Sequence, residues 1–239
     1  MRWIPWLGLG LCLAGTGCGA SLSNEDPDSS AASLESVAAG GSMGCGNTNG
    51  RVAVFQNGQM VDGAVYAGTT DTTIRQNRPA LNDAAAATCT MKGASKSRIR
   101  NECLVRWDLS QLPPMTRVGA SCIRFKVTNG SRGSFQAFEV LRPWVDVDAT
   151  WQRATGLDLW KAPGARSAAD ADSVVVATTP SRAVAGRVYE IPLASALVQK
   201  WVSIPVANNG LVFGGNGGDG LTIAASEQAD GPALVVGIP

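Results

Sequence analysis

Apolar and polar residues alternate in short segments along the chain after residue 50, and this period of two is typical of β-strands. Val105, Trp107 and Leu109 fall on one face of such a segment. In 123–127 apolar residues alternate with arginine and lysine, as expected of a half-exposed strand. Strands are predicted for nine segments: 52–55, 103–109, 123–127, 135–141, 173–177, 187–191, 211–213, 221–225 and 233–238.

Turn sequences rich in glycine and asparagine separate the predicted strands. They lie at 129–130, 209–210, 214–220 and 230–232. Only 193–201 has helical periodicity, with Leu193, Leu197 and Trp201 spaced four residues apart. The 28 glycines and 12 prolines agree with a turn-rich fold. Many short strands with at most one short helix predict an all-β protein, a jelly-roll β-sandwich, formed as a single domain by residues 51–239.

The first 20 residues (1–20) resemble a bacterial signal peptide. Their apolar stretch 3–14 is too short to span a bilayer comfortably. The following Gly-Thr-Gly-Cys resembles a lipobox in which Gly15 replaces the usual aliphatic residue. We therefore expect export, with the protein secreted or held at the outer surface or in the periplasm by a lipid on Cys18. The alternatives are ordinary cleavage near Ala20, or Cys18 as an unmodified cysteine of the apolar region.

Residues 21–50 are small and polar, and their four charges, Glu25, Asp26, Asp28 and Glu35, are all negative. This composition predicts a flexible acidic tether. One of the 20 cationic and four of the 19 acidic residues of the chain precede residue 51, which leaves 19 against 15 and a net charge of +4 for the domain. Such a weak, scattered positive charge does not favour nucleic acid as a partner.

Four cysteines remain when Cys12 and Cys18 are assigned to the leader. In an exported chain they predict two disulfides, with three ways of pairing them. We favour Cys89 with Cys103, because both would flank one hairpin, which leaves Cys45 with Cys122. Their spacing is unlike that of a zinc site, since the chain has no Cys-x-x-Cys and no histidine.

Seven segments, in order along the chain, resemble the sequence pattern of one family. They are D-T-T-I-R-Q-N-R-P-A-L-N at 71–82, L-V-R-W-D-L-S-Q-L-P at 104–113, V-G-A-S-C-I-R-F at 118–125, R-P-W-V-D-V-D-A-T-W at 142–151, Trp160 with Gly164, V-Q-K-W at 198–201 with N-N-G-L at 208–211, and S-E at 226–227 with P-A-L at 232–234. This pattern is that of the DNRLRE domain, which overlaps carbohydrate-binding module family 96 and the disaggregatase-related repeats. The sequence departs from it at Trp107, Cys122 and Asp146.

The resemblance implies a secreted or surface-attached jelly roll. It further implies, for members of the carbohydrate-binding group, an acidic polysaccharide such as alginate as the ligand. Many other members have no known ligand, so the resemblance leaves the partner of this chain open.

The stretch 75–100 is the densest positive region of the chain. It contains Arg75, Arg78, Lys92, Lys96, Arg98 and Arg100 against the single acidic Asp83. Because guanidinium groups match carboxylates and sulfates in bidentate geometry, these cations are candidate ligand-binding residues for a uronate-rich or sulfated glycan. The alternative is that they are solvated charges on loops and strand edges.

Trp144 and Trp151 are the candidate aromatic ligand-binding residues, since a flat indole stacks on a sugar ring. Both also belong to the family pattern, so packing within the fold is the alternative.

No cofactor is predicted, with calcium as an alternative. Oxygen ligands for calcium are available in the loop 216–220 and in the alternate-residue pairs Asp146 with Asp148 and Asp170 with Asp172. Ordinary turn chemistry explains the same residues.

The absence of histidine excludes Ser-His-Asp and Cys-His catalysis and removes the commonest general base. A polysaccharide lyase would need a base such as Tyr66 or Tyr189, and a glycosidase needs two carboxylates across a cleft. The candidate glutamates for such a pair are Glu102, Glu139, Glu190 and Glu227. We predict that the protein is not an enzyme.

Three functions are thus left for the structure to weigh. The first is a non-catalytic exported module that binds an anionic polysaccharide and touches the membrane only through a lipid. The second is a surface adhesion or structural protein with a protein partner and no glycan pocket. The third is a polysaccharide lyase or hydrolase.

Overall fold

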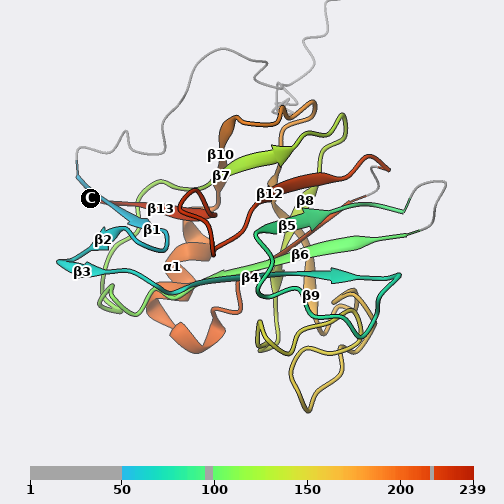
Figure 1. Ribbon diagram of the computed structural model, residues 1–239. Coiled ribbons are helices and arrows are strands. Elements are labelled where there is room, and N and C mark those ends of the chain that lie inside the picture. Colours follow the sequence, from blue (N-terminus) through green and yellow to red (C-terminus); the bar gives the residue numbers. More distant parts are fainter. Residues whose placement is uncertain (1–49, 95–98, 216–217) are drawn as a thin grey trace, which may run out of the picture. The chain divides into compact units, whose positions relative to one another are not determined.

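Two β-sheets packed face to face form the fold of residues 50–94, 99–215 and 218–239, which the computed structural model describes (Figure 1). The strands of the first sheet are β1 (Arg51–Phe55), β13 (Ala233–Ile238), β7 (Ser121–Asn129), β12 (Leu221–Ala224) and β5 (Thr88–Met91), in that order, with β10 (Val188–Leu193) paired to β7. The strands of the second sheet are β4 (Thr69–Arg75), β6 (Asn101–Trp107), β11 (Leu211–Gly214), β8 (Gln136–Val140) and β9 (Ala171–Thr178).

Three smaller elements complete the described part. The strands β2 (Met60–Val61) and β3 (Ala64–Val65) form a hairpin. The helix α1 (Ser195–Ser203) and the 3-10 turn η1 (Pro205–Ala207) connect β10 to β11. Among these residues no helix has the length and apolar composition needed to cross a membrane.

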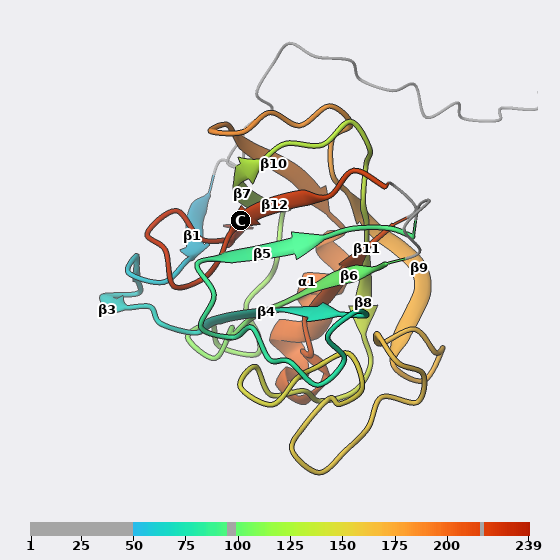
Figure 2. The same ribbon diagram turned by 45° about the vertical axis from the view of Figure 1, so that its right-hand side comes forward.

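The connectivity is that of a jelly roll, and the predicted all-β sandwich is confirmed. The first strand, β1, pairs antiparallel with the last, β13. From β4 to β8 the chain changes sheet at every connection, as the two views show (Figure 2). Each of the nine predicted strands is present with bounds shifted by a few residues, whereas β4, β5 and the β2–β3 hairpin were not predicted as strands.

The predicted helix is present but begins two residues later than its periodicity indicates. Leu193, which was predicted to begin the helix, is instead the last residue of β10 and pairs with Ser121 in the sheet. The helix buries Val198, Trp201 and Val202 against the core between the sheets.

Several predictions concern residues outside the described part. These are the signal segment 1–20, the tether 21–50 apart from Gly50, and the residues Cys18, Cys45, Lys96 and Arg98.

The core between the sheets is built from the inward-facing residues of both. Trp107, Phe125, Phe213 and Leu234 are at most 2% exposed. The indole nitrogen of Trp107 donates a hydrogen bond to the carbonyl oxygen of Pro232 at 3.1 Å, so its polar atom is satisfied inside the core.

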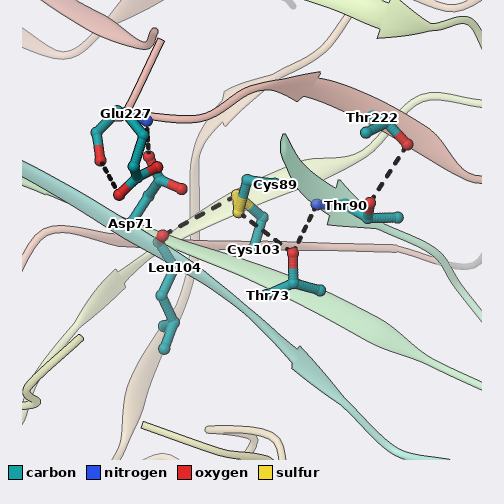
Figure 3. Close-up of a disulfide and its surroundings, with 9 residues drawn as sticks. Asp71, Thr73, Cys89, Thr90, Cys103, Leu104, Thr222 and Glu227 are labelled. Atoms are coloured by element: carbon teal, nitrogen blue, oxygen red, sulfur yellow. Dashed lines mark hydrogen bonds between the residues drawn. A yellow bond between two sulfur atoms is a disulfide. The ribbon is translucent and has the colours of Figure 1, made fainter. Parts of the chain in front are cut away.

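The Cys89–Cys103 disulfide joins the two sheets (Figure 3). Cys89 lies in β5 and Cys103 in β6, and these strands meet as a hairpin only at Lys92 and Asn101 before they diverge into different sheets. The predicted pair is confirmed, while the hairpin from which it was inferred exists only at the strand ends. Cys122 is also disulfide-bonded, and its predicted partner lies outside the described residues.

A second apolar core covers the outer face of the second sheet. Ile74, Leu104, Val140 and Val212 point outward from this sheet. Three tryptophans of the connection 141–170 pack on them, namely Trp144, Trp151 and Trp160. The connection 141–170 therefore buries the outward-facing apolar residues of β4, β6, β8 and β11.

The connection 141–170 is fixed by the side chain of Asp170, which is fully buried. Its carboxylate accepts hydrogen bonds from the backbone amides of Lys161 and Ala162, both at 2.9 Å, and from the Ser167 hydroxyl at 2.8 Å. Arg142 adds an ion pair at 3.3 Å. Although desolvation opposes ionisation, these bonds lower the pKa of Asp170, so the carboxylate stays charged and holds the segment together.

Replacing Trp107 with alanine is expected to lower the free energy of unfolding by about 3–5 kcal/mol, because the fully buried indole leaves a cavity. Chemical denaturation followed by circular dichroism measures the change. Leu157→Ala is the control, since Leu157 is 94% exposed, and it should stay within about 0.5 kcal/mol of the wild type. Equal stability of Trp107→Ala and the wild type would contradict the core described above.

Candidate functional site

A cleft of about 410 Å³ lies on the outer face of the second sheet. Its floor is formed by residues that alternate along three neighbouring strands: Glu102 of β6, Val212 and Gly214 of β11, and Gln136 and Phe138 of β8. Its wall comes from the first residues of β9, and the backbone and side chains of 164–168 cover it. We call this hollow the sheet-face cleft.

The register of the strands brings the polar floor residues together. Gly214 pairs with Gln136, and Phe213 pairs with Cys103, so Glu102 lies beside Gly214 at the end of the sheet. A Cβ atom at Gly214 would overlap the Glu102 carboxylate. Glycine at this position therefore makes room for the carboxyl group within the floor.

Glu102 is the unusual group of the sheet-face cleft, because it is only 2% exposed. Its carboxylate forms an ion pair with Arg166, which reaches down from the covering segment. Desolvation raises the pKa of Glu102 to about 7, although the charges of Arg166 and Arg100 oppose this effect. Glu102 therefore changes its protonation state near neutral pH.

Arg100 lies next to this site, and one of its hydrogen-bond donors has no partner. It is half-buried, close enough for its charge to act on Glu102, and its Nη1 atom is buried without a hydrogen-bond partner. A buried guanidinium N–H without an acceptor is costly. The Arg100 guanidinium thus adds positive charge beside the Glu102 carboxyl group, although Arg100 does not itself line the sheet-face cleft.

Four of the six predicted cations gather at this end of the sandwich. Arg75 pairs with Asn101 across the β4–β6 ladder, Lys92 bridges the same Asn101, and Arg100 precedes it. Arg78 follows in the turn after β4. The β4 and β5 arrowheads point to the same side in both ribbon views (Figure 1, Figure 2). The other two cations, Lys96 and Arg98, lie outside the described residues.

The four cations differ in exposure and in whether an ion pair compensates their charge. Arg75 forms an ion pair with Asp83, so its charge is largely compensated. Arg78 is exposed and Lys92 is half-buried. Among the described cations of the stretch 75–100, Arg100 is the one whose charge acts on the Glu102 carboxyl group.

Two further arginines from distant parts of the chain reach the same end. Arg132 and Arg182 line a second, open hollow of about 580 Å³ with Asp219. A side chain at Gly220, next to Asp219, would touch Lys92, which connects this hollow with the predicted basic stretch. We call the group of Arg75, Arg78, Lys92, Arg100, Arg132 and Arg182 the basic end.

Trp144 and Trp151 cannot serve as the stacking platform expected of them. They are 1% and 7% exposed, and both pack in the second core. The Trp144 indole nitrogen donates to the Asn209 carbonyl oxygen at 2.7 Å, and Arg106 covers the ring at 5.2 Å. A Cβ atom at Gly164 would lie 2.6 Å from the Trp151 ring, so the tryptophan and the glycine form one packing unit. Both tryptophans therefore pack within the fold, which is the alternative given in the sequence analysis.

The acidic calcium candidates that the structure describes form no metal-binding group, and Asn216 and Gly217 of the loop 216–220 lie outside the described residues. Within the described ranges, no group of three or more Asp, Glu, Cys or His side chains is placed to hold a metal ion. Asp148 accepts the Gly156 amide at 3.0 Å and Asp172 the Val174 amide at 3.1 Å, which is ordinary turn chemistry.

A second buried carboxyl group, that of Asp71, lies at the seam between the sheets (Figure 3). It is 3% exposed, accepts the backbone amide of Ser226 and lies beside Glu227. Burial raises the pKa of Asp71 to about 7; the Ser226 amide opposes this shift and the Glu227 charge adds to it. Asp71 thereby fixes the turn between β12 and β13.

No family model matches the chain, and no curated protein matches it. The resemblance of the seven ordered segments to the DNRLRE domain therefore stays a prediction. The fold and the cleft define the class of protein, a β-sandwich domain with a polar cleft on the face of one sheet.

Sequence reasoning missed Phe138 and Arg166 as site residues and weighed Glu102 only as one of four glutamates. A signal for Glu102 exists, because it is the one acidic residue in the segment Asn101–Trp107, most of whose residues are apolar. Phe138 is signalled by the apolar residues on both faces of β8. Nothing near Arg166 in the sequence indicates that it meets Glu102.

The raised pKa values of Asp71 and Glu102 predict that the domain is more stable at mildly acidic pH. A carboxyl group with a higher pKa in the folded chain contributes stability that is complete near pH 4 and is lost as the pH rises through about 7. The thermal unfolding temperature should therefore fall between pH 5 and pH 8. The unfolding temperature of Asp71→Asn should fall less over this range. That of Asp158→Asn, at an exposed position, should follow the wild type. A wild-type unfolding temperature that rises from pH 5 to pH 8 would refute this assignment.

Proposed function

We propose that this protein is a non-catalytic module that binds an anionic polysaccharide, uronate-rich or sulfated, in the sheet-face cleft. The observation that carries the proposal is the combination of residues in one hollow. Phe138 supplies an aromatic floor, Gln136 an amide, Glu102 a carboxyl group and Arg166 a guanidinium group. The charge of Arg100 also acts on Glu102. Sugar-binding sites use aromatic rings for the C–H face of a sugar and polar groups for its hydroxyls.

The basic end supports an anionic rather than a neutral ligand. Its arginines come from several separate segments of the chain, and Arg100 has a buried donor without an acceptor. Uronate carboxylates and sulfate esters both accept two hydrogen bonds from one guanidinium. A polymer of such sugars would present one acceptor after another along the basic end.

The family resemblance supports the same proposal from the sequence. We infer membership of the DNRLRE family from the ordered segments, and the packing of Trp151 against Gly164 gives two of them a physical reason. We propose that the protein acts by binding alone, without catalysis.

Export and lipid attachment at Cys18 belong to the same proposal, because a tethered module would hold polysaccharide at the cell surface. The mature protein should then begin at Cys18 and carry acyl chains. Mass spectrometry of the purified mature protein tests this, and an unmodified N-terminus at another residue would refute it.

A protein partner is the second candidate, and exposed apolar residues on the connection 141–170 favour it. Val147, Leu157 and Leu159 are 66%, 94% and 57% exposed. Large exposed apolar side chains close together mark interaction surfaces. The experiment below separates the two functions, because a protein-binding module would leave every glycan unbound.

The proposed function is tested by a glycan array with the purified protein at low and at physiological salt. Uronate or sulfated glycans should bind, and more salt should weaken the binding because the charges are near the surface. Failure of a folded sample to bind any glycan would favour the second candidate.

Arg100→Ala should weaken binding of the best array ligand roughly tenfold or more, since a charge-assisted hydrogen bond is lost. Arg117→Ala is the matched control, because Arg117 is exposed in the connection from β6 to β7 at the opposite end of the sandwich, and its affinity should be unchanged. Equal affinities of the two variants would contradict the proposed role of the basic end in ligand binding.

A further inference from the structure

We propose that the open hollow between Arg132 and Arg182 is a separate binding site for a phosphate monoester. The two arginines and Asp219 line this hollow of about 580 Å³. None of the three lines the sheet-face cleft, so the inference does not depend on the function proposed above. It goes beyond that function, because it assigns a second site and a ligand group other than a carboxylate or a sulfate.

The backbone brings the two arginines together from distant parts of the chain. Ser131 and Ala183 form an isolated antiparallel bridge, in which the Ser131 amide donates to the Ala183 carbonyl oxygen at 3.0 Å. In an antiparallel pair, the next residue of one segment lies opposite the preceding residue of the other. The register of the bridge therefore places Arg132 opposite Arg182, and like charges in this arrangement are destabilising.

No acidic partner compensates either guanidinium group. Among the described residues, the side chains of Arg132 and Arg182 form no hydrogen bond and no ion pair, and both residues are exposed. Each guanidinium can donate two hydrogen bonds to one oxyanion. An anion held between the two groups would replace their repulsion with two charge-assisted contacts.

The backbone conformation of Arg182 indicates that its side chain is needed. Its φ is 58°, in the left-handed region that glycine adopts freely and that other residues adopt only at a cost in free energy. Arg182 lies in the turn just before Ala183, where glycine would avoid this cost. Residues held in such conformations cluster at ligand sites. The strain and the uncompensated charge thus fall on the same residue, at the edge of the same hollow.

Asp219 selects the kind of anion. One oxygen of its exposed carboxylate accepts the Arg132 amide at 3.1 Å, which holds the carboxylate at the hollow. An ionised carboxylate only accepts hydrogen bonds, so Asp219 repels sulfate esters and uronates, which have no proton to donate at neutral pH. A phosphate monoester keeps one proton in part of its population, because its second pKa is about 6. That proton can be donated to Asp219 while the other phosphate oxygens accept from the arginines.

Isothermal titration calorimetry at pH 6 with glucose 6-phosphate and glucose 6-sulfate tests the inference, since the two ligands differ only in the ester group. We expect glucose 6-phosphate to bind at least about tenfold more tightly, because only it can donate to Asp219. Equal affinities for the two esters, or no binding of glucose 6-phosphate, would overturn the assignment. Neither result bears on the sheet-face cleft.

Three variants locate the site. Arg132→Gln and Arg182→Gln should each weaken the binding of glucose 6-phosphate by about tenfold or more, because charge-assisted hydrogen bonds are lost. Arg117→Gln is the matched control at an exposed arginine outside the hollow and should bind like the wild type. Wild-type affinity in both arginine variants of the hollow would show that the ester binds elsewhere.

Asp219→Asn tests the selection of the anion. The amide of asparagine can donate a hydrogen bond where the carboxylate cannot, so this variant should bind glucose 6-sulfate more tightly and lose most of the preference for the phosphate. An unchanged preference would overturn the role of Asp219.

Arg182→Gly separates binding from folding. This variant should lose binding as Arg182→Gln does, while its thermal unfolding temperature should rise by about 2–4 °C, because glycine adopts the left-handed conformation without strain. A lower unfolding temperature would show that the fold requires this arginine and would contradict its assignment to a ligand.

A phosphate monoester can belong to a sugar or to a lipid headgroup, and a soluble short-chain phosphatidate in the same titration distinguishes these sources. Tighter binding of the phosphatidate than of glucose 6-phosphate would assign the site to a lipid headgroup. Equal or weaker binding would assign it to a phosphorylated sugar. Either result supports the site, provided that Arg182→Gln weakens the binding of the preferred ligand.

Discussion

The outer face of the second sheet must be covered, because it presents Ile74, Leu104, Val140 and Val212 to whatever lies above it. The first sheet buries the inner face only. The chain meets this demand with one long connection, 141–170, whose three tryptophans pack on the sheet and whose buried Asp170 ties its backbone together. Most of the apolar burial outside the central core depends on this cover.

The same cover creates the sheet-face cleft. It ends over β8 and β11, where Gly214 leaves space for Glu102 and where Arg166 reaches down to the carboxylate. Burial beneath the segment raises the pKa of Glu102 to about 7, so the packing of the fold and the chemistry of the site have one origin. A sandwich with an exposed outer face would leave this carboxyl group in water with an ordinary pKa.

The sequence predicts the parts of the fold that follow from local pattern. Strands such as β6 and β7 alternate clearly, and the Cys89–Cys103 pair follows from their closeness along the chain. The strand β4 was not predicted, because its threonines and Asp71 lack an apolar period and are buried at a seam that only the tertiary fold creates. The meeting of Glu102 with Arg166 spans 64 residues, and no local pattern encodes it. Trp144 and Trp151 were predicted to bind ligand but are buried, because a sequence motif does not show whether the faces of a ring are covered by other residues.

We propose that the ligand binds in the sheet-face cleft. The most direct measurement is a titration of an oligogalacturonate into the 15N-labelled protein, followed by amide NMR shifts. We expect the amides of Gly214, Gly215 and Arg166, which line the cleft, to shift first and most. Shifts confined to the exposed apolar residues of 141–170, or to the opposite end of the sandwich, would contradict it.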